Sequence, residues 1–420
     1  MTFEQFGLSA EILRAVTEQG YTIPTPIQDQ AIPLVLQGKD LMGRAQTGTG
    51  KTAAFALPML ERLRAHANTS FSPARHPVRA LILAPTRELA VQVHDSFRTY
   101  GKHVPLRYAV VYGGVPIDPQ TKDLLAGVEV LVATPGRLLD HIGQRTVNLT
   151  MVEILVLDEA DRMLDMGFLP DIRKIVDMVP ARRQTLLFSA TFSAEIRALA
   201  RTMLKDPASV DIEPQFTSAE SVEQLVYLVD ATRKTELLAG LVRGRSLHQV
   251  LVFTRTKLQA GRLASQLNRF GVDAVAIHGD RTQPERERAL AGFKSGEVPV
   301  LVATDVAARG LDIEALPIVI NYELPHTAHD YVHRIGRTGR AGATGQAISL
   351  VAPDEEDYLR AVNRLLKHDL PVRVVKGFEP DLAAPRARPA RAGRSTRPTP
   401  ARPTRRPSSP SRRSGGARVA

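Results

Sequence analysis

The sequence predicts an α/β protein with two domains, each built around a mainly parallel sheet, followed by a disordered basic tail. Its 420 residues are too many for one ordinary core and suit two domains of about 200 residues each. Short apolar runs alternate with helical stretches, and this rhythm occurs twice along the chain. The end of the chain, in contrast, has almost no residues that a core could bury.

The first set of apolar runs predicts the strands of an amino-terminal domain. These runs are continuously apolar and rich in β-branched residues, which is typical of strands buried on both faces of a parallel sheet. We assign residues 31–205 to this domain and treat residues 1–30 as a separate segment before it. The runs lie at residues 80–84, 128–133, 154–158 and 185–189.

The second set predicts a carboxy-terminal domain at residues 223–376. Between the two sets, residues 206–222 are polar, contain Pro207 and Pro214 and lack a long helical period, so we predict a linker there. The runs of the second set lie at residues 249–254, 274–278, 300–304 and 318–321.

Residues 377–420 form the predicted disordered tail. They are mostly Arg, Pro, Ala, Ser and Thr, so burial cannot offset the entropy of ordering them. Of the net charge of +11, nearly all lies beyond residue 380, where eleven arginines face a single acid, Asp381. A tether for a polyanion is one interpretation, and an expendable charged tail is the other.

Composition excludes several kinds of site. The chain has no cysteine, and its 11 histidines never form an H-E-x-x-H arrangement, so any metal must be held by oxygen ligands or phosphate. No apolar run approaches the roughly 18 residues of a membrane helix. The amino terminus lacks a basic stretch followed by an apolar one, so we expect a soluble, cytoplasmic protein.

A glycine-rich loop after a candidate strand at residues 40–43 predicts a nucleotide site. Backbone N–H groups can wrap an anion there, Lys51 can reach terminal phosphates, and the Thr52 hydroxyl can bind Mg²⁺. Ala45 replaces the first glycine of the strict G-x-x-x-x-G-K-[ST] pattern, and a turn that happens to contain lysine is the alternative. The loop comprises Ala45, Gln46, Thr47, Gly48, Thr49, Gly50, Lys51 and Thr52.

Acidic residues follow the candidate strand at residues 154–158. The Asp158 carboxylate can hold Mg²⁺ beside the phosphate loop, directly or through water. Glu159 is placed to orient or deprotonate the attacking water, and Asp161 completes the Asp-Glu-Ala-Asp run. An acidic helix cap would explain one or two of these acids, but not their partnership with Lys51.

Several motifs in one fixed order resemble those of DEAD-box RNA helicases, most closely the bacterial RhlE-type branch. The similarity covers roughly residues 1–376 and implies two RecA-like domains that close over ATP, Mg²⁺ and an RNA strand. The matching segments are residues 20–28 with Phe3 upstream, 45–52, 85–90, 113–114, 134–137, 158–161, 189–191, 252–255, 303–312 and 333–340.

The resemblance assigns further residues to the ATP site and to its coupling with RNA. It implies that Phe3 stacks on adenine, that Gln28 reads the amino edge of the base and that Asp312 contacts the ribose. Arg337 and Arg340 lie in the second domain, so they can act as arginine fingers on the γ-phosphate only after the domains close. The residues implied to couple the two ligands are Asp161, Ser189, Thr191 and His333.

The RNA track is likewise implied by the resemblance. Small residues and backbone N–H groups suit contacts with a sugar-phosphate backbone, and Arg adds charge-assisted pairs to phosphate. Each glycine or threonine alone would favour ordinary turn chemistry, and the choice of RNA over DNA rests on the resemblance. The positions are Arg87, Gly114, Arg137, Arg255, Gly279 and Thr304.

We therefore predict an RNA-dependent ATPase that separates short duplexes, with the basic tail as an RNA tether. Two alternatives stay open from the sequence. One is an RNA chaperone or clamp with weak ATPase, and the other is a DNA-directed motor on the same two domains. The RNA target, the protein partners and the oligomeric state have no sequence signal.

Overall fold

The computed structural model describes residues 2–45, 48–212, 222–244, 247–308, 316–339 and 345–380. Several predicted features lie outside these residues. They are Gln46 and Thr47 of the phosphate loop, Asp312, Arg340, most of the linker and the tail beyond residue 380.

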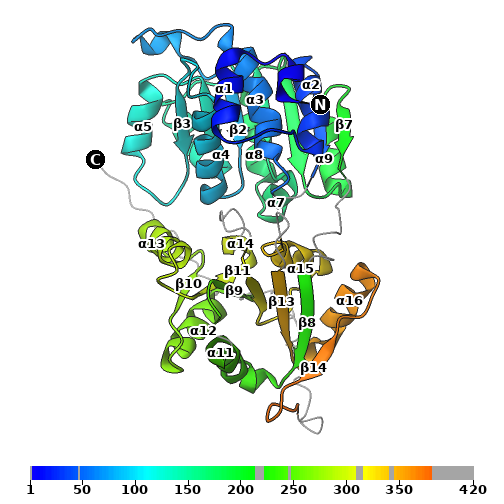
Figure 1. The fold of residues 1–420 in the computed structure, drawn as a ribbon. Coiled ribbons are helices and arrows are strands. Elements are labelled where there is room, and N and C mark those ends of the chain that lie inside the picture. Colours follow the sequence, from blue (N-terminus) through cyan, green and yellow to red (C-terminus); the bar gives the residue numbers. More distant parts are fainter. Residues whose placement is uncertain are drawn as a thin grey trace, which may run out of the picture. The chain divides into compact units, whose positions relative to one another are not determined.

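The first domain is built on a seven-stranded sheet in the order β3-β4-β2-β5-β6-β1-β7, and neighbouring strands pair in parallel throughout (Figure 1). The predicted α/β class is therefore confirmed for this part of the chain. The strands are β1 (Leu41–Arg44), β2 (Ala80–Leu83), β3 (Tyr108–Val111), β4 (Val130–Ala133), β5 (Ile154–Leu157), β6 (Gln184–Ser189) and β7 (Ala208–Asp211).

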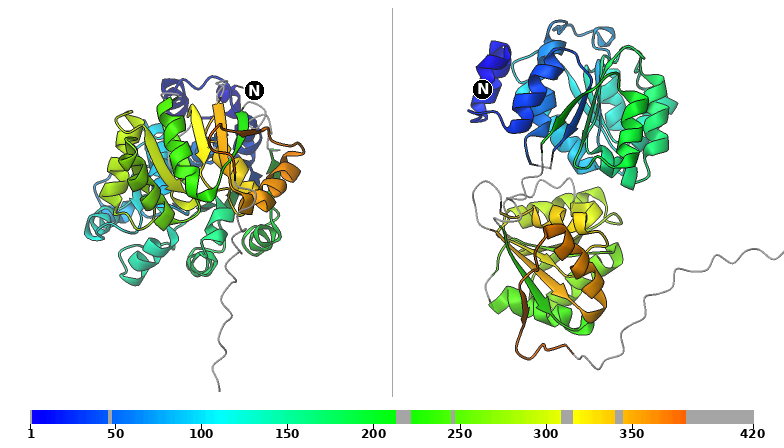
Figure 2. Two further views of the ribbon diagram at one scale, coloured as in Figure 1. Left: turned by 90° about the horizontal axis from the view of Figure 1, so that it is seen from below. Right: turned by 90° about the vertical axis from the view of Figure 1, so that its right-hand side faces the viewer.

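Two apolar clusters cover the two faces of this sheet, which explains why its strands are continuously apolar. Along β2, Ala80 and Ile82 belong to one cluster, whereas Leu81 and Leu83 belong to the other. Figure 2 (right) shows helices on both sides of the sheet. The helices are η1 (Phe3–Phe6), α1 (Ala10–Glu18), α2 (Pro26–Leu36), α3 (Lys51–Arg64), η2 (Pro73–Arg75), α4 (Arg87–Tyr100), α5 (Asp118–Leu125), α6 (Pro135–Gly143), α7 (Ala160–Asp165), α8 (Leu169–Met178) and α9 (Ala194–Met203).

The predicted linker at residues 206–222 has to be shortened. Strand β7 lies within it and pairs with β1 in parallel, with Val210 buried against the first sheet. The first domain therefore extends to Asp211 at least, and the next strand begins at Val222.

The second domain repeats the same plan. Its seven-stranded parallel sheet has the order β10-β11-β9-β12-β13-β8-β14, which is the first order with seven added to every number. Alternate residues of β9 face different clusters, with Val250 and Val252 on one side and Leu251 and Phe253 on the other. The strands are β8 (Val222–Leu228), β9 (Val250–Thr254), β10 (Ala274–Ile277), β11 (Val300–Thr304), β12 (Ile318–Asn321), β13 (Gly345–Val351) and β14 (Val372–Val374).

Helices connect these strands and carry the motifs of the second domain. None of the helices in the described part of the chain is long and apolar enough to cross a membrane. The helices are η3 (Ala231–Arg233), α11 (Lys234–Gly244), α12 (Lys257–Arg269), α13 (Gln283–Lys294), α14 (Asp305–Ala308), α15 (Ala328–Ile335), η4 (Pro353–Glu355) and α16 (Glu356–Leu366).

Candidate active site

The phosphate loop leads directly into the amino terminus of α3. Gly48 and Gly50 have φ values of +80° and +91°, which glycine adopts without the steric cost of a side chain. Lys51 is the first residue of α3, and its buried ammonium group donates to the Ala45 carbonyl at 2.9 Å. Thr52 follows on α3. The loop thus has the strand-loop-helix context that an anion site needs.

Gln28 ties the segment before the loop to the loop itself. It lies buried at the start of α2, where its Oε1 accepts from the Thr25 N–H at 2.9 Å and its Nε2 donates to the Gly50 carbonyl at 3.2 Å. A Cβ at Gly50 would lie 2.4 Å from Gln28 Nε2. Glycine at this position is therefore required by both its φ and the close approach of the amide.

The aromatic residues Phe3 and Tyr21 differ in exposure from what the predicted stacking of Phe3 on adenine suggests. Phe3 is only 3% exposed and packs edge-on against Phe6, with its centroid 6.5 Å from that of the stacked Tyr21 ring. Tyr21 is 40% exposed, and its hydroxyl lies 3.2 Å from that of Tyr100. Tyr21 therefore presents the more open aromatic surface, and an adenine contact by Phe3 stays a prediction.

Asp158 follows β5 as a buried carboxylate. Burial raises its pKa to about 6, and Lys51 opposes this effect by favouring the charged form. The carboxylate accepts from the Glu159 N–H at 2.9 Å. A cation at this carboxylate would offset the cost of burying its charge, so Asp158 suits a metal-binding role.

Glu159 is held in an uncommon backbone conformation. Its φ and ψ are 51° and 52°, in the left-handed region, and its carboxylate forms an ion pair with Arg162 at 2.9 Å. Both side chains are buried, so the backbone and Arg162 together fix the carboxylate. Arg162 was not among the predicted site residues. The signal that could have found it is the three-residue spacing of an acid and a base on one helical turn.

Asp161 joins the acidic run to the segment after β6. Its Oδ2 accepts from the N–H groups of Ala190 and Thr191, both at 3.1 Å, and from the Thr191 hydroxyl at 3.2 Å. The Ser189 hydroxyl donates to the Thr191 carbonyl at 2.7 Å. The structure thus brings together Asp161, Ser189 and Thr191, which come from segments far apart in sequence.

The three candidate RNA-binding residues of the first domain form one cluster. The Arg87 guanidinium packs so closely on Gly114 that a Cβ there would lie 2.1 Å from its Nη1. Arg137 Nη2 donates to the Val115 carbonyl at 2.9 Å, whereas its buried Nη1 has no hydrogen-bond partner among the described residues. Burial lowers the pKa of the Arg87 guanidinium. The cluster therefore has guanidinium donors available for an anion.

The three candidate RNA-binding residues of the second domain have different surroundings from those of the first domain. A Cβ placed on Gly279 would have no atom within 4 Å, and the Thr304 hydroxyl accepts from the Ala307 N–H at 3.4 Å. The Arg255 guanidinium is engaged inside the domain by the Leu324 carbonyl and by Glu355. A phosphate contact by Arg255 stays a prediction and would have to use its remaining N–H groups.

Helix α15 carries the segment predicted to contain the arginine fingers. His333 is half-buried on this helix, and Arg337 is 6% exposed just after it. The Arg337 carbonyl accepts from the Leu316 N–H at 3.0 Å. Arg340 and Asp312 lie outside the described residues, so the structure does not bear on their roles.

Metal binding by protein side chains alone is not supported in the described residues. They contain no group of three or more His, Cys, Asp or Glu side chains that could hold an ion. Mg²⁺ is commonly held by one or two carboxylates together with phosphates and water, and this arrangement fits a single buried Asp158 beside the phosphate loop.

Comparison with family models assigns both domains. Residues 25–199 match the DEAD/DEAH box helicase model, and residues 233–342 match the helicase conserved C-terminal domain. These ranges include the phosphate loop, the acidic run and α15.

Curated relatives match most of the chain. An ATP-dependent RNA helicase CshA of Listeria monocytogenes is 47% identical over 87% of this chain and 69% of that protein. The DEAD-box ATP-dependent RNA helicase CshA of Bacillus subtilis is 43% identical over 88% of this chain and 73% of that protein. Because these relatives carry the CshA name, the predicted RhlE-type branch finds no support.

Solved structures match the two-domain fold. Dbp5 of Saccharomyces cerevisiae bound to RNA and ADP BeF3 has a TM-score of 0.75 and 31% identity, covering 89% of this chain and 95% of that chain. Mss116p bound to single-stranded RNA and AMP-PNP has a TM-score of 0.79 and 28% identity, covering 91% and 80%.

Proposed function

This chain belongs to the DEAD-box family of ATP-dependent RNA helicases, and we propose that it separates short RNA duplexes locally in cycles of RNA-stimulated ATP hydrolysis. One observation carries the proposal beyond family membership. Two groups follow strands of the same parallel sheet. One is the buried acid Asp158 beside Lys51 of the phosphate loop, and the other is the arginine cluster, in which Arg137 has an unpaired donor.

In the ATP site, Lys51 and the backbone of the loop hold the phosphates. Gln28 ties this loop to the segment at residues 20–28, which we propose to recognise the adenine with Tyr21 or Phe3. Asp158 and Thr52 would hold Mg²⁺, which neutralises phosphate charge when bound. Glu159 orients the attacking water and accepts its proton.

RNA binds through its backbone at Arg87, Gly114 and Arg137 in the first domain and at Arg255, Gly279 and Thr304 in the second. The free Nη1 of Arg137 supports this proposal, because a buried guanidinium donor gains most from a phosphate oxygen. Such contacts ignore base sequence.

Hydrolysis is gated by closure of the two domains. Arg337, with Arg340, reaches the γ-phosphate only in the closed state, and RNA stabilises that state by bridging both domains. The hydrogen bonds from residues 190–191 to Asp161 support a link between the acidic run and the RNA-dependent change. ATP and RNA therefore bind cooperatively, since each favours the same state.

The basic tail acts as an electrostatic tether for RNA. Truncation after Phe378 leaves RNA-saturated ATP hydrolysis largely unchanged but weakens RNA binding, because eleven arginines and only two acids are lost. The logarithm of RNA affinity then falls less steeply with the logarithm of salt concentration. An unchanged slope would contradict the tether. We also propose a cytoplasmic location.

The proposed function is tested by ATP hydrolysis with matched RNA and DNA strands, together with separation of a short RNA duplex. We expect RNA to raise the rate and DNA of the same sequence to raise it little. Equal stimulation by DNA would favour a DNA-directed motor. Duplex binding without ATP-dependent separation would favour a chaperone or clamp.

A further inference from the structure

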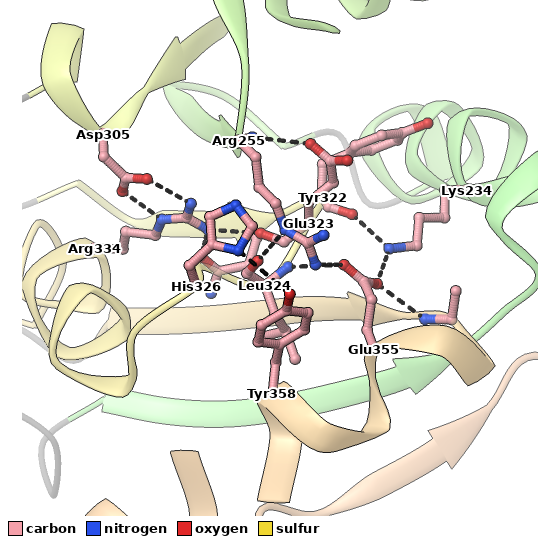
Figure 3. A network of polar contacts seen from close by, with 12 residues as sticks. Lys234, Arg255, Asp305, Tyr322, Glu323, Leu324, His326, Arg334, Glu355 and Tyr358 are labelled. Carbon is pink, nitrogen blue, oxygen red and sulfur yellow. Dashed lines mark hydrogen bonds and ion pairs between the residues drawn. The ribbon is translucent and has the colours of Figure 1, made fainter. Parts of the chain in front are cut away.

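Three successive backbone carbonyls before α15 each accept a hydrogen bond from a different cation (Figure 3). We call residues 322–324 and these cations the carbonyl clamp. The segment connects β12 to α15, the helix that precedes Arg337. The pairs are Lys234 Nζ with the Tyr322 oxygen at 2.9 Å, Arg334 Nη1 with the Glu323 oxygen at 2.6 Å and Arg255 Nε with the Leu324 oxygen at 2.6 Å.

Glu355 supplies the counter-charge of the clamp. Its Oε1 accepts from Arg255 Nη2 and from the Leu324 N–H at 3.2 Å, and its Oε2 accepts from Lys234 Nζ and from the Ala352 N–H at 3.1 Å. The side chains of Glu355 and Lys234 are only 5% and 3% exposed. Buried ions of this kind add little net stability, but they fix one arrangement because each alternative leaves a charge unpaired.

The cations come from segments that are distant in sequence. Lys234 begins α11, and Arg255 directly follows β9 with its guanidinium 4.6 Å from the centroid of the Tyr358 ring. Arg334 also forms two hydrogen bonds with Asp305, at 2.6 and 2.8 Å, and Asp305 directly follows Thr304. The clamp therefore connects two segments proposed to contact RNA with the start of α15.

The far end of α15, which Arg334 already ties to the clamp, has a further anchor at Leu316. The Arg337 carbonyl accepts from the Leu316 N–H at 3.0 Å, and the Thr338 hydroxyl donates to the Leu316 carbonyl. Helix α15 has only eight residues, so an anchor at each end fixes the backbone from which the Arg337 side chain extends. A preorganised charge needs no reordering as the transition state forms.

We infer that Lys234 and Glu355 are positioning residues for Arg337, acting through the carbonyl clamp. The inference rests on the proposed role of Arg337 as an arginine finger. Neither Lys234 nor Glu355 is proposed to touch ATP or RNA. They hold residues 322–324 so that α15, and the arginine after it, keep one orientation when the domains close.

The test uses a double substitution, Lys234→Met with Glu355→Gln. Removing one partner would leave an unpaired buried charge, whereas the double change removes both charges of the Lys234–Glu355 pair at similar volume. Arg255 loses its carboxylate partner, but it keeps the Leu324 carbonyl, and the introduced amide oxygen can still accept from it. Tyr331→Phe is the matched control, because it removes the buried hydrogen bond from Tyr331 Oη to Gln224 Oε1 at 2.9 Å, also on α15 and outside the clamp. Thermal unfolding reports the folding of each variant.

We expect the double variant to lower kcat of RNA-saturated ATP hydrolysis about tenfold relative to Tyr331→Phe, while KM for ATP changes less than about twofold. We expect kcat to change more than KM because the first domain binds the ATP phosphates, whereas Arg337 acts in the transition state. Equal kcat in the double variant and the control would overturn the inference.

Two further variants keep the result decisive. If the double variant fails to fold, Glu355→Asp retains the charge but is one methylene too short to bridge both cations, and it should show the same loss of kcat with unchanged KM. A wild-type kcat in Glu355→Asp would then overturn the inference. Arg337→Ala separates the two proposals. A wild-type kcat in this variant would contradict the arginine-finger role of Arg337. A large loss of kcat in Arg337→Ala, together with clamp variants that behave like the control, would contradict only the positioning role of the clamp.

Discussion

The two domains share one strand order but differ in the buried charges that lie near two corresponding strands, β5 and β12. After β5 of the first domain, the buried side chains of Asp158 and Glu159 are acids. Around β12 of the second domain, the fully or nearly buried groups include the cations Lys234, Arg334 and Arg337. The same parallel sheet therefore supports two different chemistries.

This difference lies in the loops and helix ends that follow the strands, since both sheets are apolar on both faces. Acids in the first domain suit a metal and an attacking water, and cations in the second suit the charge that develops on a transferring phosphoryl group. We expect that neither set is sufficient alone. Catalysis is expected only when both act on one nucleotide.

The largest expected effect comes from removing the cation of the second domain. Arg337→Ala should lower kcat of RNA-stimulated ATP hydrolysis by about a thousandfold, the lower end of what arginine fingers contribute. ATP binding without RNA should hardly change, since the loop of the first domain is intact. Steady-state kinetics and nucleotide titration check both. A loss confined to ATP affinity would assign Arg337 to ground-state binding.

Removing the acid of the first domain should have the next largest effect. Glu159→Gln should lower kcat about a hundredfold or more, because the amide cannot accept the proton of water. RNA binding in the presence of ATP should persist, so the variant accumulates a stable ternary complex that native gel electrophoresis detects. Ordinary turnover would exclude Glu159 from the mechanism. Asp177→Asn, at an exposed position of α8 in the same domain, serves as the control.

The buried Asp158 predicts a pH-dependent stability. Burial raises its pKa to about 6, above its value in the unfolded chain, so the charged carboxylate destabilises the nucleotide-free protein at neutral pH. This cost disappears as pH falls through about 6 towards 4. Asp158→Asn should therefore be more stable than the wild type at pH 7, and denaturant unfolding should show the gap closing at pH 5. A stability difference between the two proteins that is the same at pH 7 and pH 5 would contradict the raised pKa of Asp158.

The smallest expected effect concerns the arginine cluster of the first domain. Arg137→Gln should weaken RNA binding about tenfold, the value of one charge-assisted hydrogen bond, and leave RNA-independent hydrolysis unchanged. Arg98→Gln, an exposed arginine at the end of α4, is the control for net charge. Equal losses in the two variants would mean that Arg137 contributes only long-range attraction.

Much of the fold was predictable from the sequence. All eight apolar runs coincide with strands, from β2 to β12, because a strand buried on both faces must be apolar throughout. The other strands have weaker patterns. Strand β8 carries Glu223 and Gln224, β7 buries only one residue, and all three residues of β14 are exposed.

The candidate site was predictable where its residues are close in sequence or belong to a motif. The phosphate loop and the acidic run are of this kind. The ion pair of Lys234 and Glu355, in contrast, joins residues 121 positions apart, so no local sequence pattern predicts it. The burial of Phe3 also depends on packing by Tyr21 and Phe6, which residue type alone does not disclose.

The most direct test of the shared site is the affinity for RNA with and without a non-hydrolysable ATP analogue, measured by fluorescence anisotropy of a labelled strand. If acids and cations of the two domains meet on one nucleotide, the analogue should tighten RNA binding at least about tenfold, a coupling of roughly 1.4 kcal/mol. The reciprocal titration should give the same factor. Identical RNA affinities in the two conditions would contradict a site shared between the domains.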